Sequence, residues 1–499
     1  MAIPQKNDKL LPEIVFSAGG AAHAQLVWRL FRAGALRKIY SGVYTSNLDS
    51  PLENIVLRYW AEIVSNLLPG GVVSFRSAQA GKPESGSIYI TRGKTSRTIN
   101  LPGLTIRVIP GAGAVQEQGA TDVAYKGLFF ASEARWLLEN LAVGKGVATR
   151  VLPRKVIEAH LDKILQIRGE RRLNALRDSC HNLADMLGMK AEFARLDKII
   201  GALLGTHEQH QLRSHQALSR AAGKPYDPDR LERFDALFAC LKTNIMPQVP
   251  DRAATGHAME NFAFFEAYFS NFIEGTTFMV SEAEQIIFEG KVIPNRTEDS
   301  HDILGTFQAA SQAPWRNTPA RSENAFLAWL KSVNALVMKL RPDKQPGEWK
   351  DKVNQAGSTV FVDPALVQGT LREGFSRIHA LEDAFAKALM TMFVVAEVHP
   401  FQDGNGRTAR LAMNAELTAG GLSRIIVPTV YREDYLLPLK ALSNHNDPIA
   451  YLRSMSRIQQ WTAAFDYATP RHVLNDVLEA CNAFKEDLRN FRLIFPESV

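Results

Sequence analysis

One twelve-residue stretch, HPFQDGNGRTAR, combines side chains that could perform chemistry on a phosphorylated substrate. Its first residue, His399, has an ordinary pKa of ~6.5, so a neutral imidazole is available at pH 7 to accept a proton from a hydroxyl group. Asp403 offers the hard carboxylate oxygen that Mg²⁺ prefers beside phosphates. A candidate general base and a candidate metal ligand therefore lie within five residues of each other.

The glycines of this stretch predict a phosphate-binding loop. Gly404 and Gly406 flank Asn405, and two glycines around one residue let consecutive backbone N–H groups point into a concavity. The following residues are good helix formers, so a helix begins near Arg407 and its N-terminus adds partial positive charge. Arg407 and Arg410 share one face of that helix, and each guanidinium group can bind phosphate oxygens. Together these features predict phosphoryl or nucleotidyl transfer.

The stretch resembles the Fic motif, HPFx[D/E]GNGRxxR, at every defined position. The resemblance implies a helical domain that binds ATP and Mg²⁺ and transfers AMP to a Ser, Thr or Tyr hydroxyl of a target protein. It implies that His399 is the general base, that Asp403 holds Mg²⁺ and that Phe401 packs the loop onto the core. The nucleotide-binding residues that it implies are Gly404, Asn405, Gly406, Arg407 and Arg410.

A second stretch, SNFIEGTTF, resembles the inhibitory-helix motif of the same family, [S/T]xxxE[G/N]. Ser270 and Glu274 are four residues apart and share one helix face. The resemblance implies that Glu274 pairs with Arg410, denies this arginine to the γ-phosphate and inhibits the enzyme. A glutamate that merely ends a helix before Gly275 is the ordinary structural interpretation. A role of Glu274 in the reverse, AMP-removing reaction stays open.

The resemblance extends over residues 245–460. Residues 357–364, GSTVFVDP, take the place of a β-hairpin flap that would bind a target segment by backbone pairing. The segment YREDYLLPLKALSNHNDP resembles the helices that close the adenosine pocket. Tyr435 and Asn444 are the candidates for contact with the base.

The N-terminal part of the chain is basic. Residues 1–110 hold 13 Lys and Arg against 6 Asp and Glu, whereas the whole chain has a net charge of +6. The segment AAHAQLVWRLF predicts a helix, and LRKIYSGVY predicts a hairpin that turns at Ser41-Gly42. An excess of positive charge in one module predicts a polyanion partner.

These N-terminal segments, with the later RSAQA, resemble the winged-helix domains of antitoxin-type regulators from abortive-infection systems. The resemblance implies that Arg32, Arg37 and Lys38 contact DNA phosphates. A winged helix that mediates only protein contacts is the alternative.

Composition bounds the remaining possibilities. A chain of 499 residues with 46% hydrophobic residues predicts three or four domains. No run approaches the ~20 apolar residues of a membrane helix, so no membrane partner is expected. We expect no secretory signal, and the three cysteines lie far apart, which predicts reduced, buried thiols and a cytoplasmic location.

The predicted fold class is mainly α: an all-helical Fic domain with a small β-hairpin flap, preceded by a winged-helix α+β module and a helical middle region. The segment GLFFASEARWLLENL, residues 127–141, is predicted to be helical, and a linker is predicted at 244–256. The predicted domains are 1–75 (winged helix), 76–150 (α+β extension), 151–243 (helical middle region), 257–465 (Fic domain with the inhibitory helix) and 466–499 (one C-terminal helix).

The leading functional prediction is a self-inhibited protein adenylyltransferase whose N-terminal module binds DNA or a protein. One alternative keeps the fold but removes AMP or transfers phosphocholine or phosphate. The other is a transcriptional regulator whose Fic domain senses nucleotide, although a sensor does not need the general base His399. The expected ligands are ATP and Mg²⁺, and the expected macromolecular partners are a target protein, DNA and a second copy of the chain.

Overall fold

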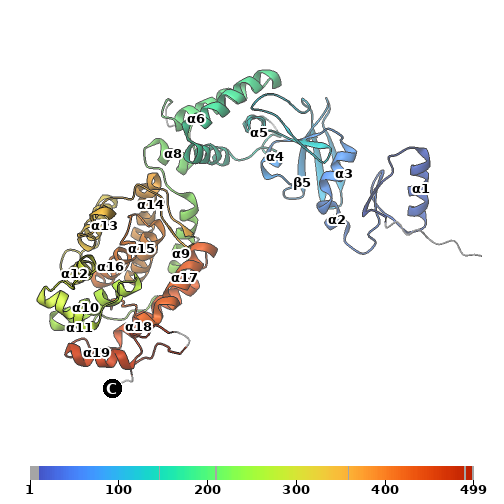
Figure 1. Cartoon of the computed structure of the whole chain (residues 1–499). Helices are drawn as coiled ribbons and strands as arrows, with labels where there is room; N and C mark the ends of the chain where they lie inside the picture. The colour runs from blue at the N-terminus through green and yellow to red at the C-terminus, as the bar shows by residue number, and fades with distance from the viewer. Residues whose placement is uncertain (1–10, 145, 208–210, 358, 488–489, 497–499) are drawn as a thin grey trace, which may run out of the picture. The chain divides into compact units, whose positions relative to one another are not determined.

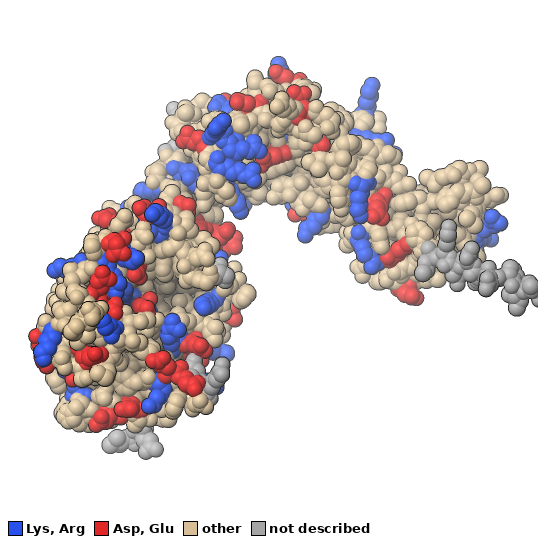
Figure 2. All heavy atoms as spheres, viewed as in Figure 1, with Lys and Arg blue, Asp and Glu red and all other residues tan. Residues whose placement is uncertain are grey.

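The computed structural model describes residues 11–144, 146–207, 211–357, 359–487 and 490–496. Its contacts divide the chain into two compact units, Met1–Ala221 and Ala222–Val499, and helices dominate (Figure 1). Basic and acidic side chains are interspersed on the visible face of each unit (Figure 2). None of the described helices is both long and apolar enough to cross a membrane. All three cysteines are buried free thiols, as predicted.

The first unit begins with a small helix–sheet module. Its elements are β1 (Ile14–Phe16), α1 (Ala21–Arg32), β2 (Arg37–Tyr40), β3 (Val43–Thr45), α2 (Leu52–Arg58) and α3 (Trp60–Leu67). The three strands form an antiparallel sheet in the order β1-β3-β2. Tyr40 pairs with Val43, which confirms the predicted hairpin at Ser41-Gly42. A single described helix precedes this hairpin, and the winged-helix assignment stays a prediction.

A six-stranded mixed sheet follows. In spatial order its strands are β6 (Arg97–Leu101), β7 (Leu104–Ile109), β5 (Ser87–Thr91), β4 (Val72–Val73), β9 (Leu128–Phe130) and β8 (Val123–Tyr125). The helix predicted over 127–141 is wrong at its start, because the N–H groups of Phe129 and Ala131 donate to carbonyls of the strand β4 region. Helix α5 (Glu133–Glu139) begins only after Ser132, whose hydroxyl accepts from the Arg135 N–H. The short helix α4 (Arg76–Ala80) lies between β4 and β5 in the sequence.

The first unit ends with helices. These are α6 (Arg154–Leu187), α7 (Lys190–Leu203) and α8 (His215–Ala221), which pack on one another and, for α6 and α7, on α5. A shared apolar core that includes Leu161, Leu176 and Ile199 joins them.

The second unit is a helical bundle around a large apolar core. Its centre is the pair α15 (Ala384–Val398) and α16 (Asn405–Ala419), which flank the HPFQDGNGR loop and pack side by side (Figure 1). Around them lie α9 (Pro228–Thr243), α10 (Gly256–Ile273), α11 (Val280–Glu289), α12 (Thr297–Ser311), α13 (Glu323–Val337), α14 (Val367–His379), α17 (Arg432–His445), α18 (Ile449–Ala463) and α19 (Arg471–Ala480). Strands β10 (Gln355–Ala356) and β11 (Thr359–Val360) form the one described hairpin of this unit. The fold is mainly helical with a small hairpin, as predicted.

Helix α9 differs from its predicted placement. The prediction assigned residues 151–243 to one middle region, but α9 packs on α14 and α15 and belongs to the second unit. Asp227 caps α9 as the sequence predicts, since its carboxylate accepts from two N–H groups of the first turn. The segment 244–256 does not separate two domains, because Asp251 N–H donates to Gly421 and Ser423 N–H donates to Val249.

The last helix is shorter than predicted. Residues 466–499 were expected to form one helix, but α19 ends at Ala480. Asn482 has a left-handed φ of 64°, and Ala483 N–H donates to the Leu478 carbonyl, so the chain turns there.

Candidate active site

His399 ends helix α15 and adopts a left-handed φ of 52°. Its imidazole stacks on Phe361, with ring centroids 3.8 Å apart and planes at 8°. The Nδ1 atom lies 3.4 Å from the Ala396 carbonyl oxygen, which suits the tautomer that carries its proton on Nδ1. In that tautomer Nε2 keeps a lone pair and can accept a proton from a substrate.

The surroundings of His399 keep its ring neutral. Burial and, after it, the positive charge of Lys350 lower the pKa of His399 to about 4, against smaller opposing effects of Ala396, Glu274 and Asp403. At pH 7 the imidazole is therefore unprotonated, which is the state that a general base needs.

Lys350 and Asn354 hold the backbone on both sides of His399. The Lys350 N–H donates to the Pro400 carbonyl at 2.9 Å, and its ammonium group donates to Asn354 Oδ1 at 2.7 Å. Asn354 Nδ2 donates to the Phe401 carbonyl at 2.9 Å. Lys350 is 2% exposed, and burial lowers its pKa to about 8. Neither residue was predicted from the sequence, because nothing local distinguishes this lysine from the others of its loop.

We expect Lys350→Met to raise the pKa of His399, because the nearby positive charge of Lys350 disfavours the imidazolium. The ring would still be neutral at pH 7. Titration of the His399 imidazole by NMR from pH 3 to 8 measures the shift. Lys352→Met removes an exposed charge two residues away and is the matched control. An unchanged His399 titration in Lys350→Met would contradict the proximity of the two charges.

Packing and hydrogen bonds fix the backbone of the loop that contains Gly404 and Asn405. Gly404 has φ 76°, and a Cβ there would lie 2.7 Å from Met338 Sδ, so only glycine fits without displacement. Asn405 accepts from the Phe401 N–H at 2.8 Å and donates to the Phe401 carbonyl at 2.9 Å. Phe401 is fully buried and stacks on Trp349, so it packs the loop onto the core as predicted. The Asn405 side chain therefore shapes the loop, and the predicted contact of the Asn405 backbone with nucleotide stays a prediction.

Glu274 lies directly after helix α10 and pairs with Arg410. Its Oε1 atom is 2.6 Å from Arg410 Nη2, so the predicted ion pair is present. Arg410 also donates from Nε to the Ser270 hydroxyl and from Nη2 to the Ser270 carbonyl, both at 2.9 Å. Burial is the largest single effect and raises the pKa of Glu274, but the charges of Arg410 and Arg407 and the hydrogen bond from Arg410 together outweigh it, so the pKa is lowered. At pH 7 the carboxylate is ionised beside the arginine.

The Glu274 carboxylate also covers the first turn of α16. A Cβ placed on Gly406 would lie 2.1 Å from Glu274 Oε1, so the oxygen rests against the Gly406 backbone. The first N–H groups of an α-helix have no intrahelical acceptors and attract anions. In this structure a protein carboxylate takes the place that such a helix terminus offers to a phosphate.

A cavity of about 570 Å³ connects these groups. Its lining includes Glu274, His399, Gly406 and Arg410, which were predicted to share a site. Both candidates for base contact, Tyr435 and Asn444, also line it, together with the hairpin residues Ala356, Gly357, Thr359 and Phe361 and the cations Arg432 and Lys440. A cavity of this size accommodates a nucleotide-sized ligand.

A buried carboxylate, Glu397, joins the hairpin to the helices beside the cavity. It accepts hydrogen bonds from Arg230 and Arg233 of α9 and from the Ser443 hydroxyl of α17. Arg230 also donates to the carbonyl of Val360 in strand β11. Burial raises the pKa of Glu397, and the Ser443 hydrogen bond and Arg233 oppose this.

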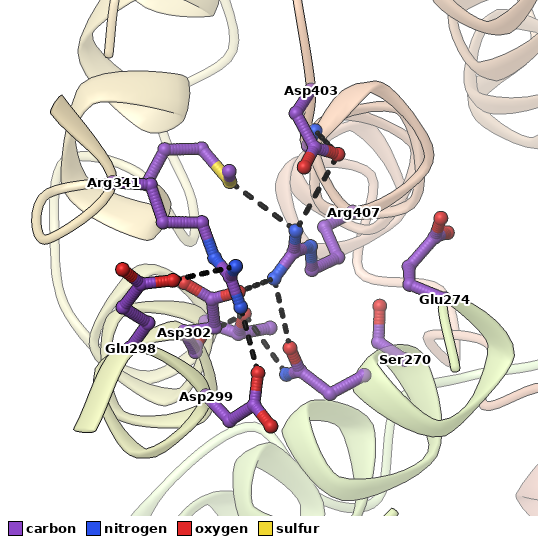
Figure 3. A network of polar contacts seen from close by, with 12 residues as sticks. Ser270, Glu274, Glu298, Asp299, Asp302, Arg341, Asp403 and Arg407 are labelled. Carbon is purple, nitrogen blue, oxygen red and sulfur yellow. Dashed lines mark hydrogen bonds and ion pairs between the residues drawn. The ribbon is translucent and has the colours of Figure 1, made fainter. Parts of the chain in front are cut away.

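Arg407 does not line the cavity. It is 3% exposed, and its Nη1 donates to Asp302 at 2.6 Å and to Asn271 at 3.1 Å. Figure 3 shows Arg407 directed at Asp302 and away from Glu274, with Arg341 bound to the same Asp302. The prediction that Arg407 binds phosphate therefore differs from the structure, in which this arginine joins α16 to α10 and α12.

Asp302→Ala is expected to destabilise the second unit by about 3 to 5 kcal/mol, because it leaves the buried Arg407 without its carboxylate. Thermal and chemical unfolding of the full chain measure the change. Glu298→Ala removes a carboxylate that pairs with Arg341 but has a side chain 57% exposed, so about 0 to 1 kcal/mol is expected. Equal losses in the two variants would contradict a structural role of the Arg407–Asp302 pair.

Asp403 directly precedes Gly404 in the loop between α15 and α16. One of its oxygens accepts from the Gly404 N–H at 2.6 Å, and its side chain is 43% exposed. Within the described ranges no three His, Cys, Asp or Glu side chains gather as a metal cluster. A single accessible carboxylate fits Mg²⁺, which takes few protein ligands and fills its shell with water and substrate phosphates.

The three residues predicted to contact DNA differ in their surroundings. Arg37 donates from Nη1 to the carbonyls of Leu48 and Ser50, at 3.1 and 2.8 Å, and so holds the following loop. The Arg32 guanidinium group lies over the Trp28 ring. Lys38 is exposed on β2.

Comparison with known proteins agrees with the geometry of the site. Residues 326–417, which include the hairpin and the loop between α15 and α16, match the Fic/DOC family. The protein adenylyltransferase Fic of Nematostella vectensis is 26% identical over 250 residues, 48% of this chain and 56% of that protein. The protein adenylyltransferase Fic of Aedes aegypti is 25% identical over 236 residues, 46% of this chain and 45% of that protein.

Among solved structures, a Fic domain containing signaling protein from Bacteroides thetaiotaomicron VPI-5482 is 17% identical, with a TM-score of 0.37, over 47% of this chain and 93% of that one. Residues 326–417, which match the Fic/DOC family, lie within the second unit. The chain is similar to Fic-type protein adenylyltransferases and spans about half the length of those relatives.

Proposed function

We propose that this protein transfers AMP from ATP to a Ser, Thr or Tyr hydroxyl of a target protein, and that Glu274 restrains this reaction. One observation carries the proposal. His399, Gly406 and Arg410 line a single cavity, and the Glu274 carboxylate lies against Gly406 while it pairs with Arg410. The proton acceptor His399 therefore lines the same cavity as the anion site formed by Gly406 and Arg410, and the Glu274 carboxylate occupies that anion site.

In the proposed reaction His399 Nε2 accepts the proton of the target hydroxyl. The hydroxyl oxygen forms a bond to the α-phosphorus of ATP, and the bond from that phosphorus to the oxygen bridging the α- and β-phosphates breaks. Pyrophosphate leaves, and AMP stays on the target. The Gly406 N–H and Arg410 would bind phosphate oxygens once Glu274 withdraws. Mg²⁺, held by Asp403, would neutralise phosphate charge.

The β10–β11 hairpin is the proposed contact for the target chain. Gln355, Ala356 and Val360 are exposed, and Phe361 of the same segment stacks on His399. An extended target segment that pairs with an exposed strand edge would bring its hydroxyl beside the imidazole.

The same site has two alternative proposed functions, nucleotide sensing and AMP removal, which rank below AMP transfer. A nucleotide-sensing regulator does not require a neutral imidazole aimed at the cavity, so the state of His399 favours an enzyme. A Fic enzyme that removes AMP would use the same groups in the reverse direction.

We further propose DNA as a partner of the first unit. We also propose a second copy of the chain as a partner, which a measurement of the molar mass in solution would reveal.

The test incubates the wild-type chain and Glu274→Gly with Mg²⁺ and ATP that is labelled on either the α- or the γ-phosphate. AMP transfer predicts that protein retains only the α-label, and mass spectrometry should locate AMP on a hydroxyl side chain. Retention of the γ-label would favour phosphate transfer. Nucleotide binding without retention of either label would favour a sensor.

A further inference from the structure

The six-stranded sheet of the first unit carries a basic groove. Two adjoining concavities of about 260 and 200 Å³ share Tyr89, Arg107 and Thr149 in their linings. Arg97 and Arg150 complete the first concavity, and Arg76 lies in the second together with Glu84. We call this surface, with its four arginines, the arginine groove.

Strand register explains why these residues meet. Arg107 of β7 lies opposite Thr98 of β6 on one side and opposite Tyr89 of β5 on the other. Residues paired across neighbouring strands project from the same face of a sheet, so the three side chains form a row. The Tyr89 hydroxyl donates to the Thr149 carbonyl at 2.8 Å, which ties the segment that carries Arg150 to this face.

The charges of the groove are largely unpaired. In the described part of the chain Arg97, Arg107 and Arg150 form no ion pair, and the one carboxylate in the lining, Glu84, lies 3.5 Å from Arg76. The Arg150 guanidinium group is held over the Phe75 ring, 4.7 Å from its centroid. Guanidinium groups that face a concavity without carboxylate partners attract phosphate, which they bind through paired N–H groups.

The groove also offers the neutral donors that phosphate contacts use. Ser96, Thr98 and Thr149 line the first concavity, and Ser77, Ser85 and Ser87 line the second. Nucleic-acid backbones are bound by this mixture of arginine with Ser, Thr and Tyr. Two adjoining concavities suit successive phosphates of a chain better than one isolated anion.

We propose that the arginine groove binds the phosphate backbone of duplex DNA. This inference rests on the proposed DNA binding of the first unit and is independent of AMP transfer. It moves the principal contact away from the hairpin residues, of which Arg37 is already bound to two carbonyls.

The experiment measures binding of the full chain to a fluorescent DNA duplex of about 20 base pairs by anisotropy, over a range of salt concentrations. Arg97→Gln/Arg107→Gln should weaken binding about tenfold or more and lower the slope of log affinity against log salt by about two. Arg32→Gln/Lys38→Gln removes the same charge from the hairpin side and should change affinity less than about threefold.

Further arms separate the remaining outcomes. Arg97→Lys/Arg107→Lys keeps the charge and should retain most of the affinity, and circular dichroism checks that every variant is folded. Equal losses in the groove and hairpin variants, or no loss in the groove variant, would overturn the proposal. So would wild-type protein that binds inorganic phosphate or an acidic peptide but no DNA at low salt. AMP transfer by Glu274→Gly, assayed in parallel, shows that a failure of either proposal leaves the other intact.

Discussion

His399→Ala is expected to lower AMP transfer by at least about 10²- to 10⁴-fold, the contribution typical of a positioned general base. The expectation rests on the neutral ring, whose Nε2 is left free by the contact of Nδ1 with Ala396. ATP affinity should change little, because the proposed phosphate-binding groups are Gly406 and Arg410. Label transfer and nucleotide binding are both measured in the Glu274→Gly background, where activity is highest.

The matched control is His379→Ala, which removes an exposed histidine of α14. It should leave transfer unchanged. If His399→Ala retains full transfer while both variants are folded, His399 is not the base. If it loses ATP binding in parallel with transfer, its role is to shape the cavity.

Glu274→Gly is expected to raise auto-modification or target modification by about tenfold to a hundredfold, because a hydrogen bond between charged groups contributes roughly 1.5 to 3 kcal/mol. The substitution frees Arg410 and the first turn of α16 for phosphates. It should fold normally, since Glu274 follows the last residue of α10 and is not inside the helix. Incorporation of α-labelled ATP over time measures the gain.

Two further variants sharpen this result. Glu274→Gln keeps the size of the side chain but removes its charge, so an intermediate gain is expected. Glu289→Gly replaces an exposed glutamate at the end of α11 and should give no gain. Wild-type rates in Glu274→Gly would show that the ion pair does not restrain the enzyme.

Local spacing predicted the parts of the site that depend on neighbouring residues. The turn after His399 and the start of α16 follow from short-range patterns. The hairpin was predicted from a resemblance at residues 357–364, and its strands lie at Gln355–Ala356 and Thr359–Val360. The pairing of Glu274 with Arg410 was also predicted, although it came from a resemblance and not from periodicity. The turn and the helix start are encoded within a few residues of one another.

The parts that were missed depend on distant segments. Arg407 and Arg410 share a helix face, yet only the packing of α12, about a hundred residues earlier, decides that Arg407 meets Asp302. Lys350 carries no motif, and its proximity to His399 follows from the path of the chain before the hairpin.

The hydrogen bonds from helix α9 to Glu397 determine where a shortened protein that contains the second unit can begin. A shortened protein that starts at residue 257, the predicted domain boundary, would lose both Arg230 and Arg233. A buried carboxylate would then lack its cations two residues before His399, and strand β11 would lose its anchor at Val360. Truncations should therefore begin no later than residue 222, where the second unit starts. An inactive product of a later start would report damage from trimming and not the absence of enzymatic capacity.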